Sequence, residues 1–263
     1  MDLGIKGKVV LVTAASKGLG KAVATQLVLE GAKVVICSRN LESLQKAKSE
    51  IAKKTNIEIS IFTCDVSDEK QVKRMINFII QEFGTIDILV TNAGGPPAGG
   101  FSDFDIGDYR KAVELNLLST ISLCQKVVPI MQKQKWGRIV MMTSVSVKQP
   151  IDNLILSNTA RAGVIGFMKS LSNEVAKDGI TVNSICPGYT KTQRVENLAK
   201  AFVESSKGTI DDFYKKLESD IPMQRIGSPE EFAQVVAFLV SEGAGYITGV
   251  SLKVDGGFAK GLF

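Results

Sequence analysis

The chain has 263 residues, 44% of them apolar and 22% charged, with a formal net charge of +5 and no histidine. This composition is typical of a folded globular protein with a sizeable core and excludes a disordered chain, while the scattered positive residues give no support for nucleic-acid binding. Without histidine there is no Ser-His-Asp triad, no Cys-His pair and no imidazole-ligated metal, and we expect no resident metal.

The four cysteines are Cys37, Cys64, Cys124 and Cys186, and none forms a Cys-x-x-Cys pair. We interpret them as buried, reduced thiols of a cytoplasmic protein. The first eight residues lack the apolar stretch of a secretory signal, and no apolar run approaches the roughly 20 residues that cross a bilayer. We therefore expect a cytoplasmic protein without a membrane-bound part.

Short apolar runs alternate with longer amphipathic segments along the chain. The predicted strands are Val9–Val12, Val34–Ile36, Ile57–Phe62, Ile88–Val90, Ile139–Met142, Val182–Ile185 and Val250–Val254. The predicted helices are Lys21–Glu30, Leu41–Lys54, Glu69–Phe83, Tyr109–Gln134, Ala160–Lys177 and Pro229–Val240. Continuously apolar strands separated by helices indicate a parallel sheet covered on both faces, with right-handed crossovers. The sequence predicts one α/β domain over residues 1–263, a doubly wound Rossmann-type sheet of about seven strands.

Two segments are expected to lie beside a ligand. A polar stretch from Thr190 to about Met223 interrupts the alternation directly after a predicted strand. We interpret it as an insert within the same domain that closes over the site as a lid. The glycine-rich segment Gly94–Gly100 forms either another wall of the pocket or a flexible linker, and both interpretations remain open.

A glycine-containing loop follows the first predicted strand and precedes a helix. Glycines at such a turn let backbone amides approach a pyrophosphate, whose charge the helix N-terminus favours. The loop therefore predicts a dinucleotide site. Its candidate cofactor-binding residues are Thr13, Ala15, Ser16, Lys17, Gly18, Leu19 and Gly20.

The end of the second predicted strand bears on which dinucleotide binds. An acidic residue about 20 positions after the glycines usually binds the adenosine ribose. Here that place holds Ser38, followed by Arg39. No carboxylate is present to repel a 2′-phosphate, and Arg39 and Lys17 can donate charge-assisted bonds to it. The sequence predicts NADP(H) in preference to NAD(H).

From end to end, the chain resembles the short-chain dehydrogenase/reductase superfamily, and in particular proteins like 3-oxoacyl-acyl-carrier-protein reductases. Thr13–Gly20 is similar to the family's Thr-Gly-x-x-x-Gly-x-Gly loop, with Ala14 at the first glycine, and Asp255-Gly256-Gly257 matches its closing turn. The resemblance implies an adenine contact, a turn that stabilises the sheet and a segment that holds the nicotinamide carboxamide. The corresponding residues here are Asp65, Val66, Asn92, Ala93, Gly94, Pro187, Gly188, Thr190 and Thr192.

The resemblance also implies catalytic roles for Asn116 and Ser144, but the family's Tyr-x-x-x-Lys pair is replaced by Ser157 and Arg161. The four-residue spacing keeps both side chains on one helix face. None of the four tyrosines restores the pair. Tyr246 precedes Lys253 by seven residues, but that interval runs into a predicted strand. The candidate catalytic residues are therefore Asn116, Ser144, Ser157 and Arg161.

This replacement changes the acid–base chemistry. A serine hydroxyl is far less acidic than a phenol, whose ordinary pKa is about 10, and a guanidinium keeps its proton but stabilises negative charge. Three interpretations remain open. The chain is an NADP(H)-dependent oxidoreductase acting on a small carbonyl or conjugated enone with an altered proton donor, such as water, Tyr189 or Lys148. Alternatively, it is a catalytically impaired NADP(H)-binding scaffold or sensor, or it performs non-redox chemistry in the same pocket.

The sequence does not identify the substrate beyond a small molecule. Lys191, Arg194 and Lys200 in the presumed lid are interpreted as solvated charges. The long predicted helices resemble those through which the family dimerises, which implies a homotetramer or a homodimer. Phe258, Leu262 and Phe263 near the C-terminus are apolar side chains whose exposure to water on a monomer would be unfavourable, which also favours association.

Overall fold

The structure is a computed structural model that describes residues 2–205 and 208–262. Its core is a seven-stranded parallel sheet in the order β3-β2-β1-β4-β5-β6-β7, which confirms the predicted doubly wound α/β fold. The strands are β1 (Val9–Val12), β2 (Lys33–Ser38), β3 (Ser60–Thr63), β4 (Ile88–Thr91), β5 (Gly137–Met142), β6 (Ile180–Pro187) and β7 (Ser251–Val254).

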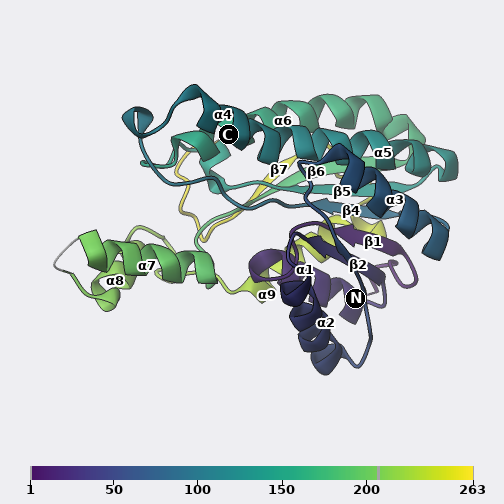
Figure 1. Cartoon of the computed structure of the whole chain (residues 1–263), viewed down its shortest axis with the longest axis horizontal. Helices are drawn as coiled ribbons and strands as arrows, with labels where there is room; N and C mark the ends of the chain where they lie inside the picture. Colours follow the sequence, from purple (N-terminus) through teal and green to yellow (C-terminus); the bar gives the residue numbers. More distant parts are fainter. Residues whose placement is uncertain (1, 206–207, 263) are drawn as a thin grey trace.

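Helices cover both faces of the sheet (Figure 1). One face carries α1 (Gly18–Leu29), α2 (Leu41–Thr55) and α9 (Pro229–Leu239), and the other carries α3 (Glu69–Phe83), α5 (Ser119–Gln134) and α6 (Ile155–Val175). Alternate residues of a strand enter opposite cores: Val10 and Val12 pack in the first, and Val9 and Leu11 in the second. Burial on both faces explains why the strands are continuously apolar.

Most predicted elements differ from the observed ones by a few residues at their ends, and α6 begins at Ile155, five residues before the predicted start. Two further differences have a clear cause. The strand expected at Ile57–Phe62 begins only at Ser60, because Asn56 ends α2 in the left-handed conformation (φ 58°) and Ile57 is exposed in the loop that follows. The helix expected at Tyr109–Gln134 consists of α4 (Ile106–Val113), a π-helical turn at Glu114–Leu118 and α5. Single π-turns inside helices are frequent at functional sites.

The insert expected from Thr190 to Met223 contains two helices. It forms α7 (Gln193–Ser205) and α8 (Ile210–Ser219), which project from the body of the molecule (Figure 1). A small apolar cluster joins the pair to the body, with Val195, Leu217, Ile221 and Ile226 at its centre. The sequence looks polar here because each helix is amphipathic and turns only one face to this cluster.

All four cysteines are buried and free, as the sequence predicts. Among the described residues, no helix is long and apolar enough to span a bilayer. Leu262 is exposed, Phe258 packs edge-on against Tyr189, and the prediction for Phe263 lies outside the described residues.

Candidate active site

The candidate site lies at the carboxyl edge of the sheet, where β1 has β2 on one side and β4 on the other. The strand order reverses at this point, and open α/β sheets bind ligands in the crevice that results. Thr13 and Asn92, which follow β1 and β4, join the two strand ends: Thr13 Oγ1 donates to Asn92 O at 2.7 Å, and Asn92 Nδ2 donates to Ala14 O at 3.2 Å. These bonds hold the phosphate loop against the Asn92–Gly94 turn.

The helix that follows this loop starts without a side-chain cap. Asn40, Asp68 and Ser228 accept bonds from the first-turn amides of α2, α3 and α9, whereas Lys17 at the start of α1 caps no amide. First-turn amides have no partner within their helix, so those of α1 remain available to an anion. This arrangement fits a pyrophosphate.

The glycines in the loop serve different purposes. A Cβ at Gly20 would lie 2.8 Å from Ala14 O and 2.9 Å from Asn92 Nδ2, so only glycine lets α1 approach the turn this closely. Gly18 has a φ of 58°, in the left-handed region that favours glycine. Ala14, at the position of the family's first glycine, also has a left-handed φ of 47° and carries backbone strain there.

The other loop residues divide between the core and the surface. Ala15 is fully buried and its amide donates to Cys37 O at 3.1 Å, which fixes the loop to the end of β2. Leu19 packs on the apolar core beneath α1. Ser16 is half-buried and Lys17 is exposed. The loop thus has a buried base and a polar outer edge.

At the adenosine end, no acidic residue closes β2. Ser38 is the last residue of the strand, and Arg39 is exposed directly after it. No ion pair of Arg39 or Lys17 occurs within the described residues. Asp65 follows β3, and its carboxylate accepts bonds from the amide and hydroxyl of Ser67 at 3.0 and 2.6 Å, while Val66 packs in the core.

Asn116 sits in the π-turn between α4 and α5 and is almost fully buried. Its Nδ2 donates to Ala112 O at 3.1 Å, but its Oδ1 has no partner. A buried acceptor without a partner is costly, so a water or ligand donor is expected at this atom. The unpaired oxygen is therefore a positive sign of a site.

Ser144 and Ser157 reach the site from different elements. Ser144 follows β5, and its Oγ accepts a bond from Ser146 N at 3.1 Å. Ser157 is buried in the first turns of α6, and its Oγ makes no hydrogen bond to a described residue. Helix α6 packs against both the π-turn and the turn that contains Ser144. A Cβ at Gly163 would lie 2.8 Å from Leu117 Cδ2, so glycine permits the approach to the π-turn.

Arg161 is a buried cation held only by carbonyl groups. Its Nη1 donates to Thr143 O at 2.9 Å and to Met142 O at 3.3 Å, and its Nη2 donates to Ala93 O at 3.5 Å. No carboxylate within the described residues pairs with it. Burial and then the nearby charge of Arg194 lower the pKa of Arg161 to about 10. The guanidinium is thus charged at neutral pH and lacks a counter-ion.

Of the two residues considered as replacement acids, Tyr189 fits that role poorly. Burial, together with the charge of Asp220, raises the pKa of Tyr189, which moves the phenol further from neutrality. The Tyr189 ring packs edge-on against Phe258 with centroids 5.3 Å apart, as an aromatic of the α7–α8 cluster would. Lys148 ends the short turn after Ser144 and is half-buried.

The segment after β6 crosses the mouth of the site. Pro187 ends β6, and Gly188 N donates to Val254 O at 2.9 Å. Thr190 is buried where the chain pairs with Gly227. The methyl group of Thr192 lies 3.9 Å from the position that a Cβ would take on Gly18. The start of α7 therefore lies over the phosphate loop.

Arg194 is exposed, as expected for a solvated charge, but it also borders the candidate site. Its guanidinium lies against Gly95: a Cβ there would be 2.6 Å from Nη1 and 2.8 Å from Cζ. Gly95 belongs to the Gly94–Gly100 segment, so this part of it borders the candidate site. One signal was present in the sequence. The stretches 137–151 and 180–195 contain arginine and lysine, and neither they nor 88–102 contain an acidic residue.

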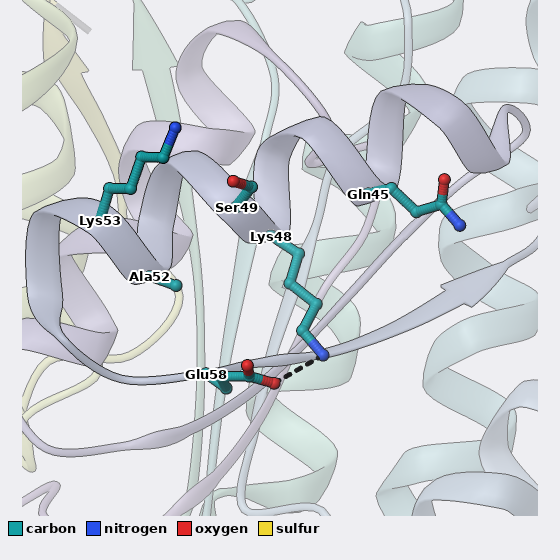
Figure 2. A pocket seen from close by; sticks show the side chains of 6 residues that line it. All are labelled: Gln45, Lys48, Ser49, Ala52, Lys53 and Glu58. Atoms are coloured by element: carbon teal, nitrogen blue, oxygen red, sulfur yellow. Dashed lines mark ion pairs between the residues drawn. The ribbon is translucent and has the colours of Figure 1, made fainter.

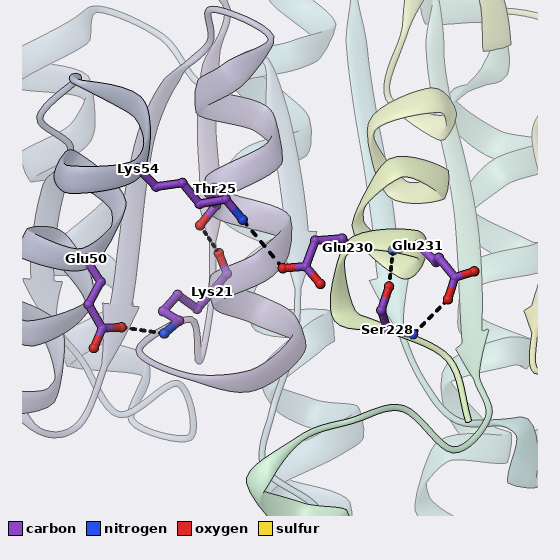
Figure 3. A network of polar contacts seen from close by, with 7 residues as sticks. All are labelled: Lys21, Thr25, Glu50, Lys54, Ser228, Glu230 and Glu231. Atoms are coloured by element: carbon purple, nitrogen blue, oxygen red, sulfur yellow. Dashed lines mark hydrogen bonds and ion pairs between the residues drawn. The ribbon is translucent and has the colours of Figure 1, made fainter. Parts of the chain in front are cut away.

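Two depressions lie elsewhere on the surface. One of about 460 Å³ runs along α2, where Lys48 and Glu58 form an ion pair at 2.9 Å (Figure 2). It contains no predicted site residue. The other, about 370 Å³, lies behind the phosphate loop between Gly18 and Thr192, beside the ion pairs Lys21–Glu50 and Lys54–Glu230 (Figure 3). These pairs tie α1 to α2, and α2 to α9.

Comparison with known proteins gives consistent matches over the whole chain. Residues 13–259 match the family described as enoyl-(acyl carrier protein) reductase. The 3-oxoacyl-[acyl-carrier-protein] reductase FabG of Aquifex aeolicus is 34% identical over 257 residues, which cover 98% of this chain and 99% of that protein.

Solved structures are equally similar. The L-sorbose reductase of Gluconobacter frateurii, complexed with NADPH and L-sorbose, has a TM-score of 0.95 at 32% identity, with 100% of both chains covered. YwfH, an NADPH-dependent reductase involved in bacilysin biosynthesis, has a TM-score of 0.92 at 29% identity, covering 98% of this chain and 100% of that one.

Proposed function

The chain belongs to the short-chain dehydrogenase/reductase family, and on that premise we propose that it is an NADP(H)-dependent oxidoreductase. Its substrate would be a small carbonyl compound or a conjugated enone. The uncapped amides of α1, the close approach at Gly20 and the lone cations Lys17 and Arg39 fit a dinucleotide with a 2′-phosphate. Relatives solved with NADPH support the same cofactor.

The observation that carries the proposal is Arg161. A buried guanidinium without a carboxylate partner is costly to maintain, so we infer that it serves negative charge that arises or binds in the site. At the position of the family's lysine it can bind the cofactor ribose and act as a fixed cation. It keeps its proton at neutral pH, and so it does not relay one.

The side chains around Arg161 suit a reduction whose product is easily protonated. When bound, the reduced dinucleotide supplies a hydride to the substrate. The Ser144 hydroxyl can hydrogen-bond the substrate oxygen on which negative charge grows, and Arg161 stabilises that charge. Asn116 Oδ1, which lacks a partner, can hold a water. A conjugated enone gives an enolate, which water protonates without a strong acid, so the missing phenol matters least there.

The direct test is consumption of NADPH by the purified protein with a panel of ketones, conjugated enones and quinones. We expect turnover, and faster turnover of enones than of the matching saturated ketones. If NADPH binds tightly and every compound is inert, the oxidoreductase proposal fails and a dinucleotide-binding scaffold or sensor remains. If saturated ketones are the better substrates, the proposed reason for losing the phenol is wrong.

A further inference from the structure

The end of the site where Arg161 lies carries two cations and no anion. Arg194, the second residue of α7, places its guanidinium against Gly95. Arg161 donates to the carbonyl of Ala93, two residues earlier in the same turn. Two guanidiniums from distant parts of the chain therefore meet one turn of backbone, directly after β4.

Within the described residues, neither guanidinium has an acidic partner. The six ion pairs involve other residues, and no hydrogen bond from Arg194 is found. The charge of Arg194 contributes to the lowered pKa of Arg161, so the two cations repel one another. Arg161 is buried and Arg194 is exposed, and an anion bound between these like charges would offset their repulsion.

The stretches 88–102, 137–151 and 180–195, which contain β4, β5 and β6 with the residues that follow them, have no aspartate or glutamate. The acidic residues directly after these stretches are Asp103, Asp152 and Glu196. Asp103 accepts a bond from Gly100 N at 2.8 Å, and Glu196 accepts one from Gln193 Nε2 at 2.8 Å. Asp255, which follows β7 beside Gly188, accepts bonds from Gly257 N at 3.0 Å and from Ala259 N at 2.9 Å. Its carboxylate is thus engaged in its own turn.

We propose that Arg194, supported by the charge of Arg161, binds a carboxylate of the substrate, so that the protein acts on a carbonyl or enone compound that carries a carboxylate close to the reacting carbon. This inference rests on the proposed function. A planar guanidinium donates two parallel bonds to a carboxylate, which orients the substrate as well as holding it. The proposal concerns binding and adds no chemical step.

The phosphates of the dinucleotide are the other possible anions. The 2′-phosphate is expected beside Lys17 and Arg39, at the end of β2. The pyrophosphate is expected at the α1 amides, over which Thr192 lies. Arg194 is directed instead to Gly95, in the turn that Arg161 also contacts. Its position therefore favours the substrate over the cofactor.

The experiment measures two affinities by calorimetry: that of NADPH for the protein, and that of oxalate, a small rigid carboxylate probe, for the NADPH-loaded protein. Arg194→Gln is expected to weaken oxalate binding by about tenfold or more and to change NADPH affinity by less than about twofold. Lys200→Gln removes one positive charge from the same helix and should change neither value, since Lys200 is exposed further along α7.

A second variant moves the arginine without removing its charge. The Cβ of Gly95→Ala would occupy the place of the Arg194 guanidinium, whose flexible side chain then has to move. We expect weaker oxalate binding at unchanged net charge. The Gly166→Ala variant is the control, because Gly166 is exposed on α6 outside the predicted site residues and a Cβ there meets no atom within 4 Å.

Three results would overturn the inference. The first is that oxalate does not bind the NADPH-loaded protein, and the second is that Arg194→Gln leaves the affinity for oxalate unchanged. The third is that Arg194→Gln weakens NADPH binding as much as oxalate binding, which would assign the arginine to the cofactor. If NADPH itself does not bind, the proposed function fails instead. In that case, if oxalate binds the free protein and Arg194→Gln abolishes this binding, an anion site at Arg194 is still supported.

Discussion

Ser157 and Arg161 keep the spacing of the family's tyrosine and lysine on one face of α6 but change their chemistry. Their identities could be read from the sequence, whereas their surroundings could not. The structure adds that Arg161 is buried and bound to three carbonyls, and that the Ser157 hydroxyl has no partner among the described residues. In the proposed reaction, Arg161 therefore stabilises negative charge and water delivers the proton.

The double variant Ser157→Tyr/Arg161→Lys restores the family's pair and should raise ketone reduction by about 10²-fold or more, because a general acid typically contributes 10²–10⁴-fold. Steady-state rates with NADPH and a saturated ketone measure the gain. The single Ser157→Tyr variant should gain less, since the neighbouring lysine that lowers the phenol pKa is missing. A folded double variant with no gain would mean that the pocket differs in more than these two residues.

The pH dependence follows from the lowered pKa of Arg161, about 10. The cation is the active form, so kcat/KM, which reports groups of the free enzyme, should be level near neutrality and fall as pH rises through about 10. Arg194 and Cys186 are the charged or titratable groups that affect this pKa. Because Arg194→Gln removes a repelling charge, it should move the fall to higher pH. A fall that starts near neutrality would contradict the assignment.

At the scale of elements, the site depends on how closely α6 approaches the π-turn. The sequence predicts most of α6, from Ala160 onward, and one continuous helix over Tyr109–Gln134. It does not predict the turn itself, since a π-turn changes the hydrogen-bond pattern without a distinct residue signal. Nor does it predict that Arg194 lies on Gly95, because that contact joins segments about a hundred residues apart.

The same glycine-to-alanine substitution at two positions of α6 tests this packing. At Gly166 a Cβ meets no atom within 4 Å, so Gly166→Ala should stabilise the protein by about 0.5–1 kcal/mol through helix propensity. At Gly163 the added Cβ would lie 2.8 Å from Leu117 Cδ2, so Gly163→Ala should lose that gain and lower activity. Urea unfolding of both variants measures the difference. Equal stabilisation would show that α6 does not pack tightly on the π-turn.

At the scale of the whole molecule, the doubly wound parallel sheet and its cover of helices on both faces were accessible from sequence, because continuous apolar runs separated by helices permit few other folds. The α7–α8 pair was not. Its amphipathic helices have a polar composition, and the sequence analysis assigned the segment as an insert without predicting its two helices. Whether the pair closes over the site stays a prediction.

The resemblance to the family implies that copies of the chain associate with one another. We expect a homotetramer or a homodimer, measured as a mass of about four or two times 28.3 kDa by light scattering after gel filtration. Dilution to low micromolar concentration should leave the assembly intact. A mass equal to that of one chain at all concentrations would contradict the expected association, but it would not contradict the proposed active site.

The central claim is that this crevice binds a dinucleotide with a 2′-phosphate, and titration calorimetry with NADPH and NADH tests it most directly. We expect NADPH to bind at least about tenfold more tightly than NADH, and Arg39→Ala to remove most of that difference while leaving NADH affinity unchanged. Lys33→Ala, an exposed charge at the opposite end of β2, is the matched control. Folded protein that takes up neither reduced dinucleotide would contradict the account.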